Sequence, residues 1–227
     1  MNVGRKSQGW CCVTFLLILA CCSFWGSGCS SGSASVKKVQ VADLPPGDGK
    51  PECVLASTDR PAMLIERKRQ MFQLSGEKGL PFFNQDRLRN ESAMIIELTC
   101  ANHETVFTLK PKARIAFQPN ALVLEQGTGH LFFRKVNGTY KVIIPGATLA
   151  IRGTRLQATV NEDRSSEVEL YEGSVAMIDA AGKETTLNPG QKATFGVDGK
   201  SCSIADLGDL PGVFDQLSPD KVRKTIR

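Results

Sequence analysis

The sequence predicts an all-β domain that begins near residue 53 and ends near residue 204. Short apolar runs recur roughly every 8–12 residues, and turn-forming pairs such as Glu172-Gly173 and Pro189-Gly190 separate them. Some runs alternate apolar and charged residues, as in Glu167–Tyr171, which is the pattern of a strand with one buried face. No long stretch has helical periodicity. A sandwich, a barrel and a short repetitive β-solenoid all fit this pattern.

Each apolar run of this domain is expected to form a strand. The predicted strands lie near Ala62–Glu66, Ala93–Cys100, Thr105–Leu109, Ala113–Phe117, Ala121–Glu125, His130–Val136, Thr139–Ile144, Ala147–Ile151, Leu156–Val160, Glu167–Tyr171, Val175–Asp179, Glu184–Leu187 and Lys192–Phe195. Asn137-Gly138 between two of these runs predicts a two-residue hairpin turn, because both residues tolerate positive φ. Gly127-Thr128-Gly129 is predicted to be a loop, since no helix follows it to build a phosphate site.

The first 28 residues are predicted to be an export signal. Arg5 and Lys6 precede an uncharged stretch from Trp10 to Trp25, which is shorter than the ~20 residues of a membrane-spanning helix. The basic residues are expected to stay in the cytoplasm, so the rest of the chain lies on the periplasmic side of a bacterial membrane.

Two cysteines follow small residues in a way that resembles a bacterial lipobox, where the thiol is acylated. Cys29 follows Gly26-Ser27-Gly28, and Cys21 follows Ala20. Cys29 is the favoured lipid attachment site, because the Ser/Gly-rich stretch after it suits a flexible tether. Cys21 is the alternative site, and an uncleaved signal anchor without lipid is a further alternative.

Two flanking regions differ from the β-domain in composition. Residues 29–52 are rich in Ser, Gly, Pro and Lys and are predicted to be a flexible linker. Residues 205–227 are predicted to be a tail that could hold a short helix and could dock on the domain through its apolar residues or fray in solution.

Charge and metal-binding residues exclude several function classes. The net charge of +5 is spread over both signs, which is not the footprint of a nucleic-acid-binding protein. With only two histidines, His103 and His130, a histidine-built metal site is not expected, and no cofactor is expected. Cys53, Cys100 and Cys202 remain after the signal, and they allow one disulfide whose pairing the sequence does not choose, or simply buried thiols.

Enzymatic activity is not expected either. The sequence contains neither GxSxG nor HExxH. The acidic pairs Glu162/Asp163 and Glu167/Glu169 are more typical of solvated surfaces, and a hydrolase using a carboxylate pair would need two of them to converge in a pocket. We therefore expect no small-molecule substrate. The basic groups Arg67–Arg69 and Lys110–Arg114 are predicted to be solvated strand edges, with contact to anionic lipid headgroups as an alternative.

Three sequence pieces between Lys141 and Phe195 follow one another in a specific order. They are VIIPGATLAIRGT (Val142–Thr154), EGSV (Glu172–Val175) and LNPGQKA (Leu187–Ala193). In this order they resemble the FecR domain, which occurs in the periplasmic part of iron-siderophore signalling regulators and in other envelope proteins. The resemblance covers about residues 60–200. It implies an all-β, solenoid or sandwich-like domain of mostly antiparallel strands.

The residues of this motif are expected to be structural. Gly153 interrupts two apolar runs and is expected at a bulge or bend, and Thr154 is expected to cap the bend through its hydroxyl group. If Arg152 points inward, its guanidinium needs a partner, either Glu172 or Glu167, or backbone carbonyls. Gly173, Pro189 and Gly190 complete the set of motif residues.

The expected function is binding. The domain is expected to contact another envelope protein or, less favoured, a polysaccharide. The resemblance also implies an alternative, an accessory component of a cell-surface signalling system with FecR-type sigma regulation. Against it, only nine residues precede the hydrophobic stretch, so no anti-sigma helix bundle is expected there, and the tail looks too short for a transporter-signalling segment.

Overall fold

The described part of the chain is built almost entirely from strands. The computed structural model describes residues 35–100, 105–133, 140–151, 153–199 and 201–208. Within these residues the regular elements are 18 strands and one 3-10 turn, η1 (Val41–Asp43). The prediction of an all-β fold is therefore confirmed.

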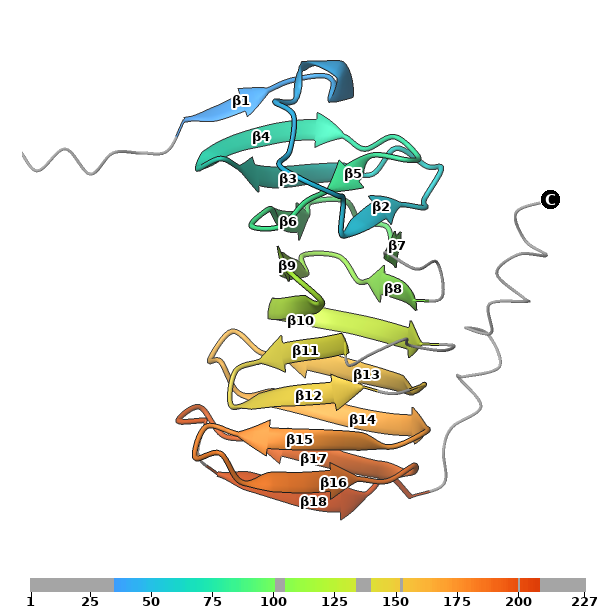
Figure 1. The fold of residues 1–227 in the computed structure, drawn as a ribbon, viewed down its shortest axis with the longest axis vertical. Coiled ribbons are helices and arrows are strands. Elements are labelled where there is room, and N and C mark those ends of the chain that lie inside the picture. Colours follow the sequence, from blue (N-terminus) through green and yellow to red (C-terminus); the bar gives the residue numbers. More distant parts are fainter. Residues whose placement is uncertain (1–34, 101–104, 134–139, 152, 200, 209–227) are drawn as a thin grey trace, which may run out of the picture. The chain divides into compact units, whose positions relative to one another are not determined.

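The strands form two layers, sheet A and sheet B, that enclose the core between them (Figure 1). Sheet A contains, in spatial order, β1 (Val36–Lys38), β4 (Gln70–Ser75), β3 (Ala62–Arg67), β6 (Arg87–Asn90), β9 (Arg114–Gln118), β10 (Ala121–Phe133), β11 (Tyr140–Ile144), β12 (Ala147–Ile151), β15 (Val175–Asp179) and β16 (Glu184–Leu187). Sheet B contains β5 (Pro81–Phe82), β2 (Cys53–Leu55), β7 (Ile96–Cys100), β8 (Thr105–Leu109), β10 again, β13 (Arg155–Val160), β14 (Ser166–Glu172), β17 (Gln191–Phe195) and β18 (Cys202–Asp206). Neighbouring strands are antiparallel except for the pairs β1–β4 and β10–β11.

Strand β10 belongs to both layers. Its first half pairs with β9 and β11 in sheet A, and its second half pairs with β8 and β13 in sheet B. The strand bends where the register shifts between Leu124 and Gln126, and Gly127 follows with a φ of 87°. The prediction of two strands separated by a Gly127–Gly129 loop is therefore wrong, because the glycine lets one strand bend without ending.

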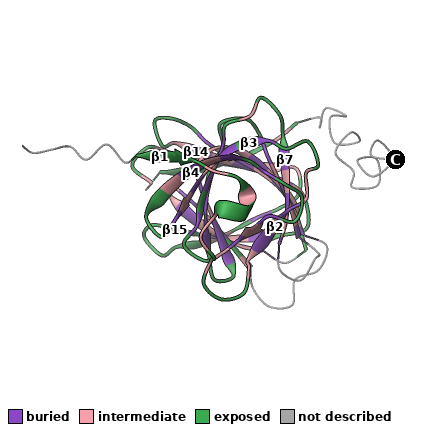
Figure 2. Ribbon diagram, turned by 90° about the horizontal axis from the view of Figure 1, so that it is seen from above, coloured by how far each residue is buried: buried purple, intermediate pink, exposed green. Residues whose placement is uncertain are grey.

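Alternation of side chains along the strands fills the space between the sheets. In β13, for example, Leu156, Ala158 and Val160 are buried while the residues between them are half-buried on the outer face. Figure 2 shows the buried positions gathered on the inner side of the strands. Aromatic rings contribute to this core, including a stacked pair, Phe82 and Phe117, whose centroids lie 5.1 Å apart.

Two of the three cysteines of the domain form a disulfide, and the third has a free thiol. Cys53 of β2 and Cys100 of β7 lie opposite each other in register and form a disulfide. Cys202 in β18 has a free, exposed thiol. One pair and one leftover is the arrangement that the sequence left open as an alternative to buried thiols.

Residues near the N-terminal boundary close one end of the two-layered stack. β1 adds a parallel strand beside β4, and η1 follows it. Val39, Val41 and Leu44 pack against the core from this end, and Figure 2 shows the helical turn over the centre of the strands. The folded unit thus begins before residue 53, because these apolar side chains belong to the core and not to a linker.

The basic triplet at the turn after β3 is not uniformly solvated as predicted. Lys68 and Arg69 are exposed, but Arg67 is buried. Its guanidinium donates hydrogen bonds to both carboxylate oxygens of the buried Asp86 and to the backbone carbonyls of Pro45 and Pro81. The alternation in β3 places Arg67 on the inner side, so its charge is compensated there rather than by water.

The predicted Asn137-Gly138 turn lies outside the described residues, but the strands on either side of it do not form a hairpin. The second half of β10 pairs with β8 and β13, whereas β11 crosses to sheet A and pairs in parallel with the first half of β10.

Within the described parts of the chain, no helix is long and apolar enough to span a membrane.

Candidate protein-binding surface

The outer side of sheet A carries an apolar surface over β10, β11, β12 and β15. The local sequences of these strands explain it. Val142-Ile143-Ile144, Ala147–Ile151 and Val175–Ile178 hold almost no polar residue. Because successive residues of a strand face opposite sides, continuous apolar runs place apolar side chains on the outer face as well as in the core.

The inward and outward residues of these strands separate clearly. Val142, Leu149, Ile151 and Val175 are 0% exposed and belong to the core. The alternate residues point outward, and we call them the apolar face: Val123, Ile143, Thr148, Ala150, Ala176 and Ile178.

Strand register brings the members of the apolar face side by side. Ile143 lies opposite Val123 on one side and opposite Thr148 on the other. Thr148 in turn lies opposite Ile178, and Ala150 lies opposite Ala176. Directly opposed side chains in a sheet are about 5 Å apart, so these six residues form one continuous patch. Ile178 is its most exposed large side chain, at 39%.

Charged residues border this patch. Lys141 of β11 lies directly opposite Ala150, and Glu184 of β16 lies directly opposite Ile178. Arg87 of β6 forms ion pairs with Glu66 of the neighbouring β3 (3.5 Å) and with Glu125 of β10 (3.2 Å), which lies beyond β9. An apolar centre with a charged rim is the usual anatomy of a protein interface.

The outer side of sheet B differs because it is polar and internally hydrogen-bonded. Lys192 lies 2.6 Å from the Glu167 carboxylate, and Gln157 donates a hydrogen bond to Glu169 (3.3 Å). The hydroxyls of Thr128 and Thr159 are 3.1 Å apart. These polar groups are already paired with one another. A partner that covered this face would have to break or bury these pairs, whereas the apolar face has only apolar side chains and one threonine to cover.

His130 lies on the same outer side of sheet B, between β8 and β13. Burial and the nearby charge of Lys110 lower its pKa to about 4, whereas Glu169 opposes the shift. The imidazole is therefore neutral near pH 7. No group of three or more His, Cys, Asp or Glu side chains in the described residues is arranged to hold a metal ion.

The predicted motif residues meet at the junction of β13, β14 and β15. Gly153 has a φ of 62°, and Thr154 is 2% exposed. A β-carbon on Gly173 would lie 2.7 Å from Cγ2 of Thr154, so the Arg-Gly-Thr and Glu-Gly pieces touch. The Thr154 hydroxyl, which was expected to cap the bend, has no hydrogen-bond partner among the described residues.

The expected partners of Arg152 have other partners here. Arg152 itself lies outside the described residues, as do Cys21 and Cys29. Glu172 forms an ion pair with Arg155 (3.2 Å).

The turn containing Pro189 ends at Gly190, whose amide donates a hydrogen bond to the Leu170 carbonyl (2.8 Å).

The acidic residues considered for catalysis lie on exposed or hydrogen-bonded surfaces. Asp163 lies in an exposed turn, where hydrogen bonds from Ser165 lower the pKa of its carboxyl group. Glu169 on β14 accepts hydrogen bonds from Gln157 and from the Tyr171 hydroxyl.

The candidate surface that the sequence analysis did not identify is the apolar face. Its signal was present in the uninterrupted apolar runs of Ala147–Ile151 and Val175–Ile178. Glu167–Tyr171 of sheet B instead alternates apolar and charged residues. Uninterrupted apolar runs in β12 and β15 indicate that sheet A carries apolar side chains on both faces.

No family model and no curated protein matches the sequence. Two solved structures, each described as a "putative anti-sigma factor" from Parabacteroides distasonis, are similar in fold. One is 16% identical with a TM-score of 0.48 over 59% of this chain and 64% of that chain. The other is 15% identical with a TM-score of 0.43 over 54% and 57%. The match spans less than two thirds of either structure, and neither similarity transfers a function to this chain.

Proposed function

We propose that this chain is an exported, lipid-anchored envelope protein without enzymatic activity, whose FecR-like β-domain binds another envelope protein through the apolar face. The observation that carries this proposal is the continuous outward patch that runs from Val123 to Ile178 across four strands. The motif resemblance between Val142 and Ala193 supports the FecR-like assignment, and the lipobox-like Cys29 supports the anchor.

The chemistry of the apolar face favours a protein over a polysaccharide. Thr148 supplies the single side-chain hydroxyl among its six members, whereas sugar recognition needs many hydrogen-bonding groups. Both tryptophans, Trp10 and Trp25, lie in the predicted signal, so the domain has no indole platform for a sugar ring. An apolar sheet surface of a partner, in contrast, can pack flat against it at about 10 Å.

One matched pair of variants tests the binding surface. Ile178→Lys places a charge in the apolar face, directly opposite Glu184, so the new cation has a cross-strand partner. The control Thr194→Lys places the same charge on the outer side of sheet B, directly opposite Glu167. The tagged proteins are cross-linked in their own host, and mass spectrometry identifies what co-purifies.

The expected result is a partner that is recovered with the unaltered chain and with Thr194→Lys, but lost with Ile178→Lys. Equal recovery with both variants, or no partner with the unaltered chain, would overturn the proposal. Recovery of an outer-membrane transporter or a membrane regulator as that partner would favour the alternative, an accessory role in FecR-type signalling.

The lipid anchor has its own test. Metabolic labelling with a radioactive fatty acid should label the unaltered protein and the Cys21→Ser variant, but not Cys29→Ser. Loss of label with Cys21→Ser instead would move the attachment to that residue. An unlabelled but membrane-bound protein would mean an uncleaved signal anchor.

A further inference from the structure

The loop between β6 and β7 exposes two neighbouring apolar side chains. Met94 is 44% exposed and Ile95 is 51% exposed. Among the large apolar residues that the described parts of the chain expose, these are the two that are adjacent in sequence, and Ala93 before them is exposed as well. Single exposed apolar side chains are common on soluble proteins, whereas an exposed cluster indicates contact with a partner or a membrane.

The turn between β8 and β9 adds positive charge beside this apolar pair. Ile96 lies directly opposite Leu109 in the β7–β8 ladder, so Ile95 and Lys110 are neighbours just beyond the end of that ladder. Lys112 follows in the same turn, and both lysines are exposed. Two cations that are distant in sequence from the apolar loop are therefore next to it in space.

One buried side chain holds the loop and the turn together. Asn90 is 0% exposed, and its side-chain amide donates hydrogen bonds to the Met94 carbonyl (2.9 Å) and to the Lys110 carbonyl (3.2 Å). Its backbone carbonyl accepts a hydrogen bond from the Lys112 amide (2.9 Å). We call residues 93–95 together with the two lysines the basic tip. The tip is preorganised by Asn90, so binding does not have to order it first.

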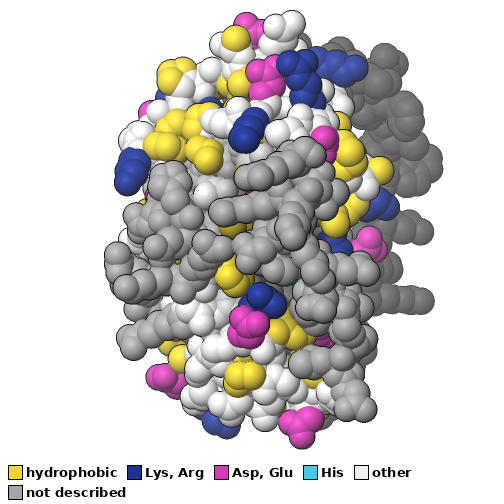
Figure 3. Space-filling view, turned by 90° about the vertical axis from the view of Figure 1, so that its right-hand side faces the viewer, with side chains coloured by type: hydrophobic (Ala, Val, Ile, Leu, Met, Phe, Trp, Pro, Cys, Tyr) yellow, Lys and Arg dark blue, Asp and Glu magenta, His cyan; other side chains and the backbone are white. Residues whose placement is uncertain are grey.

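The charge of the basic tip is not neutralised within the described residues. Basic and acidic side chains are mixed over much of the described surface, as Figure 3 shows for one face. The described lysines that form ion pairs are Lys68 and Lys192, so neither lysine of the basic tip has such a partner there. Glu91, the acidic residue of the same loop, is already in an ion pair with Arg89.

An anionic membrane surface fits this combination better than another protein does. Lysine is depleted at protein–protein interfaces, but it is favoured beside anionic lipids, which attract basic segments. Apolar side chains can enter the boundary between headgroups and acyl chains. The long lysine side chains can meanwhile keep their ammonium groups among the lipid phosphates.

We propose that the basic tip docks on an anionic phospholipid surface, with Met94 and Ile95 inserted below the headgroups and Lys110 and Lys112 on their phosphates. The tip is separate from the apolar face, so this contact goes beyond the proposed protein binding. The proposed N-terminal anchor keeps the domain near a bilayer, and the tip fixes which side of the domain faces that bilayer.

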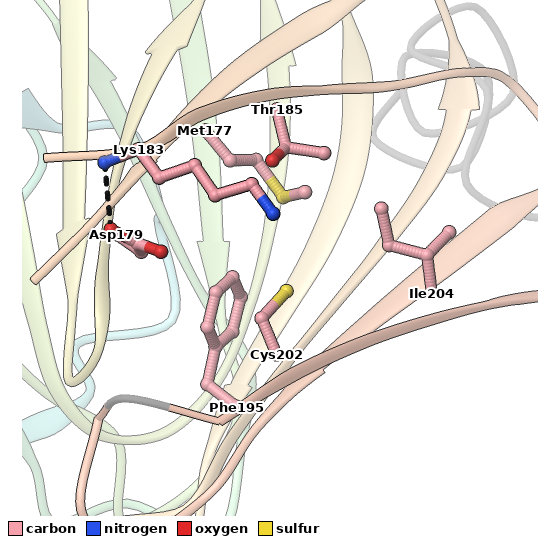
Figure 4. A pocket seen from close by; sticks show the side chains of 7 residues that line it. All are labelled: Met177, Asp179, Lys183, Thr185, Phe195, Cys202 and Ile204. Atoms are coloured by element: carbon pink, nitrogen blue, oxygen red, sulfur yellow. Dashed lines mark hydrogen bonds between the residues drawn. The ribbon is translucent and has the colours of Figure 1, made fainter. Parts of the chain in front are cut away.

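The test uses the full chain reconstituted into vesicles of equal parts phosphatidylcholine and phosphatidylglycerol, which contain no other protein. A photocross-linking residue replaces Met94, and mass spectrometry measures the fraction of the protein that carries a phospholipid adduct. The reference position is Ile204, which is 39% exposed and belongs to β18, the last strand of sheet B. Its side chain lines a hollow of about 250 Å³ at that far end of the stack (Figure 4).

A matched pair of double variants tests the role of charge. Lys110→Gln/Lys112→Gln removes the two cations of the basic tip. The control Lys141→Gln/Lys183→Gln removes the same charge from two lysines elsewhere on the domain. All four side chains are exposed, so neither double variant should unfold the protein.

The expected result is abundant lipid adduct at position 94 and only background at position 204. Each lysine near an anionic surface contributes about fivefold to binding, so Lys110→Gln/Lys112→Gln should lower the adduct at position 94 roughly tenfold or more, and the control less than about twofold. Vesicles of phosphatidylcholine alone should give the same loss as the removal of the two lysines.

Equal adduct at positions 94 and 204 would overturn the proposal, and so would an adduct that depends neither on Lys110 and Lys112 nor on phosphatidylglycerol. A cross-link to a second copy of the chain in place of lipid would also overturn it, since the tip would then be a contact between copies. Because the vesicles hold no partner protein, these outcomes are independent of whether the apolar face binds one.

Discussion

Gly173 packs against Thr154 so closely that no side chain fits between them. A β-carbon on Gly173 would lie 2.7 Å from Cγ2 and 3.1 Å from Cα of Thr154, and it would also collide with the carbonyl oxygen of Gly153. Two pieces of the sequence motif that are about 20 residues apart thus meet where the residues just before β13 contact the turn between β14 and β15. The glycine is required by this contact and by its φ of 85°.

Substitution of Gly173 should therefore destabilise the domain more than substitution of an ordinary turn glycine. Gly173→Ala is expected to cost about 2 kcal/mol or more in unfolding free energy, from backbone strain together with the collision. Gly182→Ala is the matched control, because Gly182 has a similar φ of 79° but no neighbouring atom within 4 Å of the added β-carbon. It should cost only about 1 kcal/mol. Equal losses in urea unfolding would show that the contact with Thr154 contributes nothing.

Arg67 should be among the most sensitive charged residues. Its guanidinium and the Asp86 carboxylate are both buried at 2.6 Å, so Arg67→Ala leaves a buried carboxylate without its counter-ion. We expect a loss of about 3–5 kcal/mol in unfolding free energy. Arg87→Ala removes two ion pairs from a side chain that is 57% exposed and should cost less than about 1 kcal/mol. Chemical denaturation of both variants measures the difference, and similar losses would refute the role of burial.

Reduction of the Cys53–Cys100 disulfide should lower stability without removing the fold. The bond closes a 47-residue separation, and restricting that loop in the unfolded chain is worth about 2–4 kcal/mol. Thermal unfolding with and without a reductant measures the effect, and Cys202→Ser serves as a control because Cys202 is not bridged. An unchanged Tm after complete reduction, verified by mass, would contradict the prediction.

Acidification should weaken the fold partly through His130. Its pKa is about 4 in the folded chain and about 6.5 when unfolded, so the unfolded chain binds more protons between these values. Stability is then fully present above pH ~6.5 and is lost as the pH falls toward 4. Since the ring is half-buried beside Lys110 and Glu169, we expect a contribution on the order of 1 kcal/mol. The His130→Gln variant should show a correspondingly flatter pH dependence of unfolding free energy, and an identical dependence would rule the contribution out.

The strands from Leu156 to Phe195 could be predicted well from the sequence, because their local pattern and their final environment agree, whereas β18 (Cys202–Asp206) was not predicted. Leu156–Val160 and Glu167–Tyr171 alternate in period two, and each has one face in the core and one in water. The turns at Gly173 and Gly190 could also be predicted, since these glycines separate consecutive apolar runs.

Other features depend on contacts that are distant in sequence. Phe72 and Leu74 of β4 are buried, but the polar residues around them hide the short strand. Arginine is usually found at the surface, and Arg67 can be buried only because Asp86, 19 residues later, neutralises its charge. The bend in β10 was predicted to be a loop because glycine commonly interrupts strands. Only the pairing with the neighbouring strands shows that β10 continues through Gly127.

The order of strand pairing implies a gradient of local opening along the stack. No described pairing joins the first strands to the last, because β1 to β5 pair only as far as β7, and β14 to β18 pair only as far back as β12. In such a linear arrangement, each layer opens independently of those far from it. The backbone amides of β10, which pairs with β8, β9, β11 and β13, should therefore exchange with deuterium last. Those of β1, β5, β16 and β18, each of which pairs with one neighbouring strand, should exchange first.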